Sequence, residues 1–374
     1  MFSFTVKSAE KSYIPDSVDR RNPRPLNEQV YDEICRAIAE KRLVPGDVLP
    51  RREKLAEAFG VGVNTVRQAV ERLVAEKIIV SRPRVGCQIA PDVPSFFCGK
   101  ILYVLTEFSG AYAAGMLRAA LENEFMRSGY HLFAVNVDWK GDHHFAQKVL
   151  KAALAERPDF VIVNTCPFGD TEALRLIVRS GIPYVTLNGR RKRCGNLIAA
   201  FHNDFSAAVA DFLSACKRSR VMSIAQFDFG EHSFIDISRP FEQCGINVER
   251  VSLALDEVFS RLEAIQDSAV AATRRWSRRS AMPDLIFFSD DYIARGALPV
   301  LLEQGVKVPS DVRIVTLSNR GFPPAFTHPL DAIEFDPAVA GRTLAQRVSD
   351  YLRTGKMDTD PVCVYSFIPR GMLQ

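Results

Sequence analysis

The chain has 374 residues, of which 47% are hydrophobic and 25% charged, with 21 Gly and 21 Pro. This is the composition of an ordinary globular protein, and it excludes disorder, a collagen helix and a coiled-coil rod. At roughly 100 to 200 residues per domain, the length indicates two or three domains. Apolar bursts such as 159–163 and 285–288 have the length of strands, far shorter than the ~18 residues of a membrane helix, so we expect no membrane partner.

The first residues do not form a secretory signal, because Lys7, Glu10 and Lys11 interrupt the apolar core that such a signal needs. We therefore expect a cytoplasmic protein. The eight cysteines lie at least eleven positions apart, so no C-x-x-C pair occurs. This spacing argues against zinc sites and disulfide frameworks, and we expect neither a metal nor a cofactor.

The net charge of +4 is unevenly distributed. Residues 20–90 carry 14 Lys and Arg against 9 Asp and Glu, whereas residues 91–374 carry 32 of each. The positive excess thus belongs to one segment of about seventy residues, the size of a small DNA-binding domain. A basic domain joined to a neutral one suggests a reader of a polyanion fused to a second function, although the charge alone is also compatible with a solvated basic face.

Three helices are predicted in the basic segment. From Leu26, apolar residues recur at three- and four-residue steps until Pro45-Gly46. A second helix is predicted over 52–59 and ends at the glycines that follow. A third begins near Asn64, whose short polar side chain could cap it. Two helices joined by a tight turn form a helix-turn-helix.

A two-stranded hairpin is predicted next, because the β-prone runs 78–80 and 85–89 flank a basic tip. Residues 26–90 resemble the winged helix-turn-helix head of GntR-family regulators. The resemblance rests on VYDEICRAIAEKRLVPGDVLP, KLAEAFGV, NTVRQAVERLVAEKIIV and the RxxVGC wing. The chain departs from the family pattern at Glu53 and Val63, where arginines are usual, and at Arg84, where a glycine is usual.

The resemblance implies that the third helix enters the major groove and brings Thr65, Arg67 and Gln68 to base edges or phosphates, with Arg67 the first choice for base readout. It also implies phosphate contacts before the second helix and minor-groove contacts from the wing. Asn64 could cap the helix or touch DNA. The predicted DNA-binding residues are Arg51, Arg52, Asn64, Thr65, Arg67, Gln68, Arg82, Arg84 and Gly86.

Residues 91–99 contain two prolines and no helical period, so we predict a linker there between the head and a body over 100–374. In the body, β-rich bursts alternate with amphipathic stretches, which predicts an α/β fold of parallel sheets in two lobes. Strands are predicted at 101–105, 130–136, 159–163, 183–187, 197–201, 221–225, 285–288 and 313–317. Helices are predicted at 112–128, 142–156, 171–180, 205–215, 258–276 and 291–304.

The body resembles the two-lobed effector-binding part of LacI-type repressors, which is related to periplasmic sugar-binding proteins. This resemblance spans about residues 100–372. It is carried by the phrases GIPYVTLNGR, AAFHNDFSAAVADFL, PDLIFFSDDYIARGALPVLLEQGVKVPSDVRIVTLSN and HPLDAIEFDPAVAGRTLAQRVSDYL, the last followed by a short closing strand. A GntR-like head on a LacI-like body is the combination found in repressors of the arabinose-regulator type. The expected fold is therefore a winged helix-turn-helix followed by a periplasmic-binding-protein-like α/β body.

In such a body the ligand lies between the lobes, at the carboxyl ends of the strands. By resemblance, Asp291 accepts hydrogen bonds from ligand hydroxyls, although it could also cap the helix that begins there. Acids, amides and arginines favour a polyol, so the expected effector is a sugar, with Trp139 and Trp276 as possible stacking residues. The predicted effector-binding residues are Phe108, Asn164, Asn188, Arg190, Arg239, Asp291 and Asn319.

The sequence contains no G-x-S-x-G, G-x-x-x-x-G-K-[ST] or H-E-x-x-H motif, so we do not expect an enzyme. The favoured function is a transcription regulator of the repressor type, a homodimer on a palindromic double-stranded DNA operator, controlled by a small carbohydrate. Two alternatives stay open: a carbohydrate-binding receptor without specific DNA binding, and an enzyme. Effector identity and operator sequence are not predicted.

Overall fold

A computed structural model describes residues 18, 20, 24–83, 85–93, 99–105, 111–137, 143–164, 171–187, 195–230, 233, 235–253, 262–278 and 281–373. The chain divides into two compact units, Met1–Lys100 with Met126–His131, and Ile101–Phe125 with Leu132–Gln374. Within the described residues, no helix is both long and apolar enough to cross a lipid bilayer.

The head contains three helices and a hairpin: α1 (Leu26–Ala39), α2 (Arg52–Phe59), α3 (Val63–Ala75), β1 (Ile79–Arg82) and β2 (Gly86–Ile89). The predicted bounds of the second helix are confirmed, and α3 begins one residue earlier than predicted. Apolar side chains from all three helices form one core, including Ile34, Leu55, Phe59, Val66, Val70 and Leu73. The amphipathic periods of the sequence thus fold into a small independent core.

The segment before α2 is tied to the hairpin. The backbone N–H of Leu49 donates to the carbonyl of Cys87 at 2.8 Å, and that of Ile89 donates to Asp47 at 2.8 Å. An isolated bridge joins Val48 to Gln88. This added strand-like segment fixes the wing to the loop that leads into α2, which a two-stranded hairpin alone would not provide.

The first lobe of the body is a five-stranded sheet in the order β4-β3-β5-β6-β7, and the pairs from β3 through β7 are parallel. Side chains of α5 and α6 cover one face, where Leu150 and Ile177 meet Leu102, Val104 and Val161. Its elements are β3 (Gly99–Leu105), α4 (Tyr112–Arg127), β4 (Tyr130–Asn136), α5 (His143–Ala155), β5 (Phe160–Asn164), α6 (Thr171–Ser180), β6 (Tyr184–Leu187) and β7 (Leu197–Phe201).

The second lobe is a seven-stranded sheet in the order β10-β9-β11-β12-β13-β14-β8, in which only the β13–β14 pair is antiparallel. Phe288 and Ile314 pack beneath α9 and α10 on one face, and Phe287 meets Phe212 of α7 on the other. Its elements are β8 (Asn203–Asp204), α7 (Ser206–Arg218), β9 (Ser223–Asp228), α8 (Ser238–Glu242), β10 (Asn247–Ser252), α9 (Leu262–Trp276), β11 (Leu285–Phe288), α10 (Asp291–Glu303), β12 (Arg313–Asn319), β13 (Asp331–Phe335) and β14 (Cys363–Ile368).

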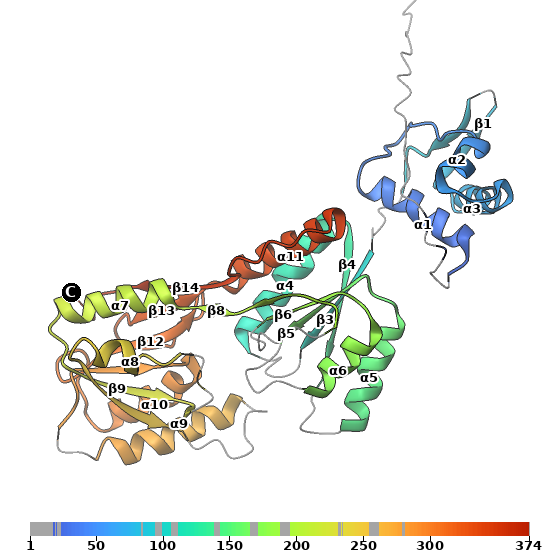
Figure 1. Cartoon of the computed structure of the whole chain (residues 1–374). Helices are drawn as coiled ribbons and strands as arrows, with labels where there is room; N and C mark the ends of the chain where they lie inside the picture. Colours follow the sequence, from blue (N-terminus) through green and yellow to red (C-terminus); the bar gives the residue numbers. More distant parts are fainter. Residues whose placement is uncertain are drawn as a thin grey trace, which may run out of the picture. The chain divides into compact units, whose positions relative to one another are not determined.

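The chain passes between the lobes more than once. It leaves β7 of the first sheet for β8 of the second, and after β13 it enters helix α11 (Pro337–Thr354) before returning in β14. Figure 1 shows α11 alongside α4, and Tyr351 of α11 meets Phe160 of β5 at 5.5 Å between ring centroids. Helix α11 therefore packs on the first lobe, although its flanking strands belong to the second.

Most of the predicted strands and helices of the body are confirmed, some with shifted ends. Residues 221–225, for example, were expected as a strand that the structure places at Ser223–Asp228. The elements β8, β10, β13, α8 and α11 were not predicted. The α/β class and the parallel sheets in two lobes are confirmed.

Helices α9 and α10 pack so closely that a side chain at one glycine between them should destabilise the fold. A Cβ added to Gly296 of α10 would lie 2.4 Å from the carbonyl oxygen of Gln266 in α9. We therefore expect Gly296→Ala to lower the free energy of unfolding by about 1–3 kcal/mol, through overpacking. Gly115→Ala is the control, because nothing lies within 4 Å of its Cβ position in α4, and we expect it to raise stability by up to about 1 kcal/mol. Urea unfolding compares them, and equal effects would contradict the packing argument.

Candidate functional site

The first turn of α3 is organised around Arg67. Its Nε and Nη2 atoms donate to Oδ1 of Asn64 at 3.1 and 2.7 Å, and its Nη1 donates to Oε1 of Glu71 at 2.9 Å. An arginine has five N–H groups, so two remain after these bonds. The guanidinium is thus held on the surface of the helix, with donors still available.

The expectation that Asn64 caps α3 is wrong. The N-cap is Gly62, whose backbone is extended, and no side chain caps the helix. Because the helix begins at Val63, Asn64 lies inside its first turn, and its amide oxygen turns toward Arg67 three residues later. Asn64 therefore orients Arg67 in this structure.

The other described members of the predicted DNA-binding set are also accessible. Arg51, Arg52, Gln68 and Arg82 are exposed, and Thr65 is half-buried. Gly86 pairs with Arg82 at the end of the hairpin. Its φ angle is +106°, and a Cβ added there would lie 3.8 Å from the side chain of Val48. Glycine is the residue that adopts this backbone conformation without strain, so Gly86 shapes the wing. Arg84 lies outside the described residues.

The predicted effector residues that the structure describes lie at strand ends. Asn164 ends β5, and its Nδ2 donates to the hydroxyl of Tyr103 at 2.9 Å. Asn319 ends β12, and its Nδ2 donates to Oδ1 of Asp291 at 3.4 Å. Arg239 lies exposed on α8. Phe108, Asn188 and Arg190 fall outside the described residues, as does Trp139.

Asp291 does not cap α10. The cap is Asp290, whose Oδ1 accepts from the backbone N–H of Tyr292 at 2.8 Å. Asp291 instead turns inward, and its side chain is only 3% exposed. Among the described residues, its Oδ2 atom has no hydrogen-bond partner. This Oδ2 lies 3.7 Å from Nε of Arg295, which is too long for a hydrogen bond.

Two other buried carboxylates of this lobe are fully engaged. Asp228 accepts from Gln226 at 2.7 Å, Arg250 at 2.7 Å, the N–H of Gly230 at 2.8 Å and Ser252 at 3.0 Å. Asp331 accepts backbone N–H groups at the end of the chain. Buried charges normally have such partners, so the open acceptor of Asp291 distinguishes it from these structural acids.

Burial, and repulsion from Asp290, raise the pKa of Asp291 to about 7, although Arg295 opposes the shift. Burial likewise raises the pKa of Asp290 to about 6. A carboxyl that loses its hydration without gaining donors is less acidic. Such perturbed acids gather where a ligand or reactant supplies the missing interaction.

Arg295 was not predicted. Its Nη2 donates to the carbonyls of Phe322 at 2.9 Å and Pro323 at 3.3 Å, and its Cζ lies 4.0 Å from the centroid of the Phe322 ring. Its position four residues after Asp291 on one helix was the available sequence signal. No sequence spacing indicated Phe322, because it belongs to a loop.

Trp276, a possible stacking residue for the sugar, belongs to the core. It packs against the α9–α10 cluster, and its ring meets Phe227 edge-on at 5.1 Å. This is the arrangement of two core aromatic side chains, so it does not support the stacking interpretation.

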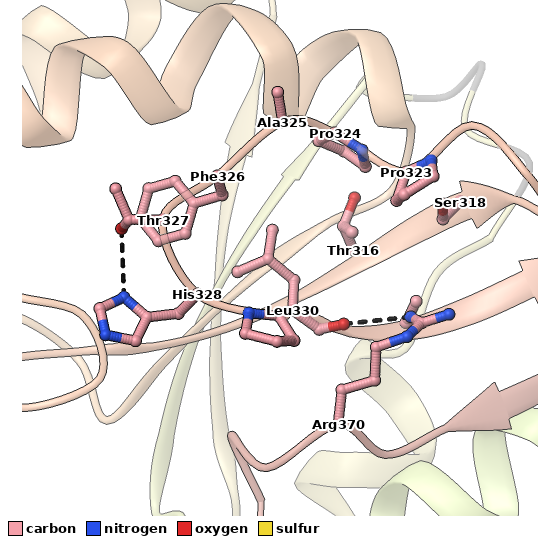
Figure 2. Close-up of a pocket in the computed structure, with 12 residues that line it drawn as sticks. Thr316, Ser318, Pro323, Pro324, Ala325, Phe326, Thr327, His328, Leu330 and Arg370 are labelled. Atoms are coloured by element: carbon pink, nitrogen blue, oxygen red, sulfur yellow. Dashed lines mark hydrogen bonds between the residues drawn. The ribbon is translucent and has the colours of Figure 1, made fainter.

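A pocket of about 520 Å³ opens beside β12, lined by the loop 323–330, Thr316, Ser318, Ala332 and Arg370. Figure 2 shows Arg370 with its guanidinium directed to the carbonyl of Leu330, a bond of 3.1 Å. Arg370 also pairs with Glu334. Seven of its twelve lining residues are apolar, including three prolines, and Ser318 is one of the polar ones.

Comparisons with known proteins agree with the two-part architecture. Residues 26–89 match the model of bacterial regulatory proteins of the gntR family, and residues 237–371 match that of a periplasmic binding protein-like domain. This chain joins a GntR-family head to a periplasmic-binding-protein-like body.

Solved LacI-type regulators share the fold of the body. A LacI family regulator from Bifidobacterium animalis subsp. lactis has a TM-score of 0.57 and 17% identity, covering 72% of this chain and 96% of its own. The CelR–cellobiose complex has a TM-score of 0.58 and 16% identity, covering 86% of this chain and 99% of its own. At this identity the likeness concerns the fold alone.

The curated relatives match the head. The mannosyl-D-glycerate transport/metabolism system repressor MngR of Escherichia coli is 45% identical over 58 residues, which are 16% of this chain and 24% of that protein. The HTH-type regulator YhdI of Bacillus subtilis is 32% identical over 79 residues, which are 21% of this chain and 17% of that protein. The chain thus spans 17% and 24% of the length of these two relatives. They are named as transcriptional regulators rather than enzymes.

The raised pKa of the buried Asp291 carboxyl predicts that the free energy of unfolding depends on pH. Because its pKa is raised to about 7, the folded chain holds a proton that the unfolded chain releases, so stability falls as pH rises from about 4 to 7. Asp291→Asn removes this loss, and we expect it to be about 1 kcal/mol more stable than the parent at pH 8, with the gap closing toward pH 4.

Urea unfolding at both pH values measures the difference. Asp228→Asn is the matched control, because it removes a charge with four donors, and we expect it to destabilise by about 3–5 kcal/mol. Asp291→Asn losing as much stability as Asp228→Asn would show that Asp291 is a structural acid.

Proposed function

We propose that this chain is a transcription regulator of the repressor type. The head binds a double-stranded DNA operator through the first turn of α3, and the body binds a small carbohydrate at Asp291. The observation that carries the DNA half is the surface-held guanidinium of Arg67 in a domain of gntR type. An arginine with a fixed direction can donate two parallel hydrogen bonds to guanine in the major groove.

The chemistry at Asp291 supports a polyol. The buried Oδ2 of Asp291 accepts no hydrogen bond from the described residues, and the hydroxyls of Ser289 and Ser318, at the ends of the same two strands, are also buried and without one. A sugar hydroxyl donates and accepts at once, so it can satisfy both kinds of atom. Among proteins of similar fold, one is described as a cellobiose complex and another as bound to sucrose.

We infer a homodimer as the working form. One head of this size covers only a half-site, and two linked heads on a palindrome gain affinity from their linkage as well as from contacts. The proposed target is chromosomal DNA, so the proposal also puts the protein in the cytoplasm. The proposed partners of this dimer are double-stranded operator DNA and a small carbohydrate effector.

The DNA half is tested with Arg67→Ala on operators selected from a pool of random duplexes. We expect a loss of about 1–3 kcal/mol in binding free energy and relaxed sequence preference at the bases that Arg67 contacts. Arg274→Ala is the control of equal charge, because Arg274 forms a surface ion pair with Glu303 on the body, and its affinity should match the parent.

Fluorescence anisotropy at several salt concentrations gives both affinity and the number of phosphates neutralised. Unchanged affinity of a folded Arg67→Ala variant would contradict groove readout. If the parent protein binds sugars but no DNA duplex at low salt, it is a carbohydrate-binding receptor without specific DNA binding.

The effector half is tested by thermal shift against a panel of mono- and disaccharides. A ligand of the native state raises stability by RT ln(1 + [L]/Kd), about 2.7 kcal/mol at a hundredfold excess over Kd. We expect at least one sugar to raise the melting temperature and Asp291→Asn to abolish that shift. A shift that survives Asp291→Asn would remove Asp291 from the site, and turnover of the sugar would indicate an enzyme.

A further inference from the structure

An aromatic stack joins the two lobes. Tyr112 begins α4 on the first lobe, and its ring lies 4.6 Å from that of Phe322 with 16° between the planes. Phe322 belongs to the loop after β12 on the second lobe. Parallel aromatic rings at this distance attract beyond their buried area, so the contact favours one spacing of the lobes.

Further contacts accompany the stack. The backbone N–H of Tyr112 donates to the hydroxyl of Tyr292 at 3.3 Å, and the hydroxyl of Tyr112 donates to the carbonyl of Arg320 at 3.3 Å. Gly321 allows this approach, since a Cβ there would lie 3.0 Å from the Tyr112 hydroxyl oxygen. The start of α4 is therefore bound to the start of α10 and to one loop of the opposite lobe.

Arg295 connects this contact to the buried acid. Its guanidinium carbon lies 4.0 Å from the centroid of the Phe322 ring. The Phe322 ring therefore contacts both Arg295 and Tyr112. The Nε of the same guanidinium has no hydrogen-bond partner among the described residues and lies 3.7 Å from Asp291. Arg295 thus interacts with both the carboxylate and the stack.

We propose that Tyr112, Phe322 and Arg295 form an inter-lobe clasp, and that Arg295 is a positioning residue that makes its strength depend on Asp291. A charged Asp291 without a ligand draws the guanidinium toward itself and away from the ring. A ligand hydroxyl that donates to Oδ2 weakens this attraction and leaves Arg295 to the ring and to the carbonyls of Phe322 and Pro323. The ligand step rests on the proposed function, whereas the clasp itself does not.

The clasp is tested first without ligand, by hydrogen exchange of the full chain. Phe322→Leu should speed exchange about tenfold in a peptide from the start of α4, on the opposite lobe, as well as in the loop 319–323. Phe145→Leu is the control, because Phe145 is an exposed aromatic residue of the first lobe, and it should leave both peptides unchanged. Faster exchange confined to the loop would overturn the clasp.

The role of Arg295 is tested by a double-mutant cycle. Asp291→Asn should slow exchange at the start of α4, because the neutral amide no longer attracts the guanidinium. In an Arg295→Met background the same change should have no effect. An effect of Asp291→Asn that persists without Arg295 would show that the acid acts by another route.

The sugar panel then separates the two proposals. Exchange that responds as described while no sugar binds would support the clasp and contradict the carbohydrate effector. A sugar could instead bind through Asp291 in both the parent and Phe322→Leu without changing the hydrogen-exchange rate at the start of α4 in either protein. That result would support the proposed effector site and contradict the clasp.

Discussion

The body is organised around one carboxylate that is buried without enough hydrogen-bond donors. Asp291 follows a strand of four buried residues at the sheet edge where the parallel strands β11 and β12 both end. At this position the amide of Asn319 donates to its Oδ1 at a long 3.4 Å, and no described residue donates to its Oδ2. Burying a charge in this way costs free energy that proteins usually recover through pairing. The proposed ligand site and the proposed clasp both follow from this unmet need.

The same lobe shows that the fold can satisfy buried acids elsewhere. Asp228 is the last residue of β9, at the same sheet edge, and receives donors from two strands and a loop. Asp331 is enclosed by the backbone of the last residues. The difference at Asp291 is therefore local. Its neighbour Asp290 takes the N–H groups at the start of α10, and Arg295 is turned toward the loop carbonyls. Sites that bind ligands are commonly held in such unsatisfied states at the expense of stability.

Much of this arrangement could be predicted from sequence. Periodicity located α2 and most of the β-strands, because these segments have a single buried stripe or an unbroken apolar run. It missed β13 and α11. The strand DAIEF is short and contains two acids, and the buried face of α11 recurs at helical spacing but is formed largely by the small residues Ala340, Gly341, Ala345 and Ser349, which give a weak apolar signal. The cap of α3 was misjudged because Gly62, with an extended backbone, starts the helix before Asn64. Asp291 was predicted through its resemblance to a family, but its contact with Arg295 and the loop position of Phe322 depend on tertiary packing.

The energies of the proposed coupling are consistent with regulation. Allosteric effects commonly amount to about 1–3 kcal/mol. A stacked aromatic pair contributes about 0.5–1.5 kcal/mol and a cation over a ring about 0.5–2 kcal/mol. The contacts of Phe322 with Tyr112 and Arg295 are therefore of the right size to shift a two-state equilibrium without locking it. A stronger contact, such as a fully buried ion pair, would hold the lobes in one arrangement whether or not a ligand was bound. An arginine shared between an exposed ring and an incompletely satisfied acid leaves both arrangements accessible.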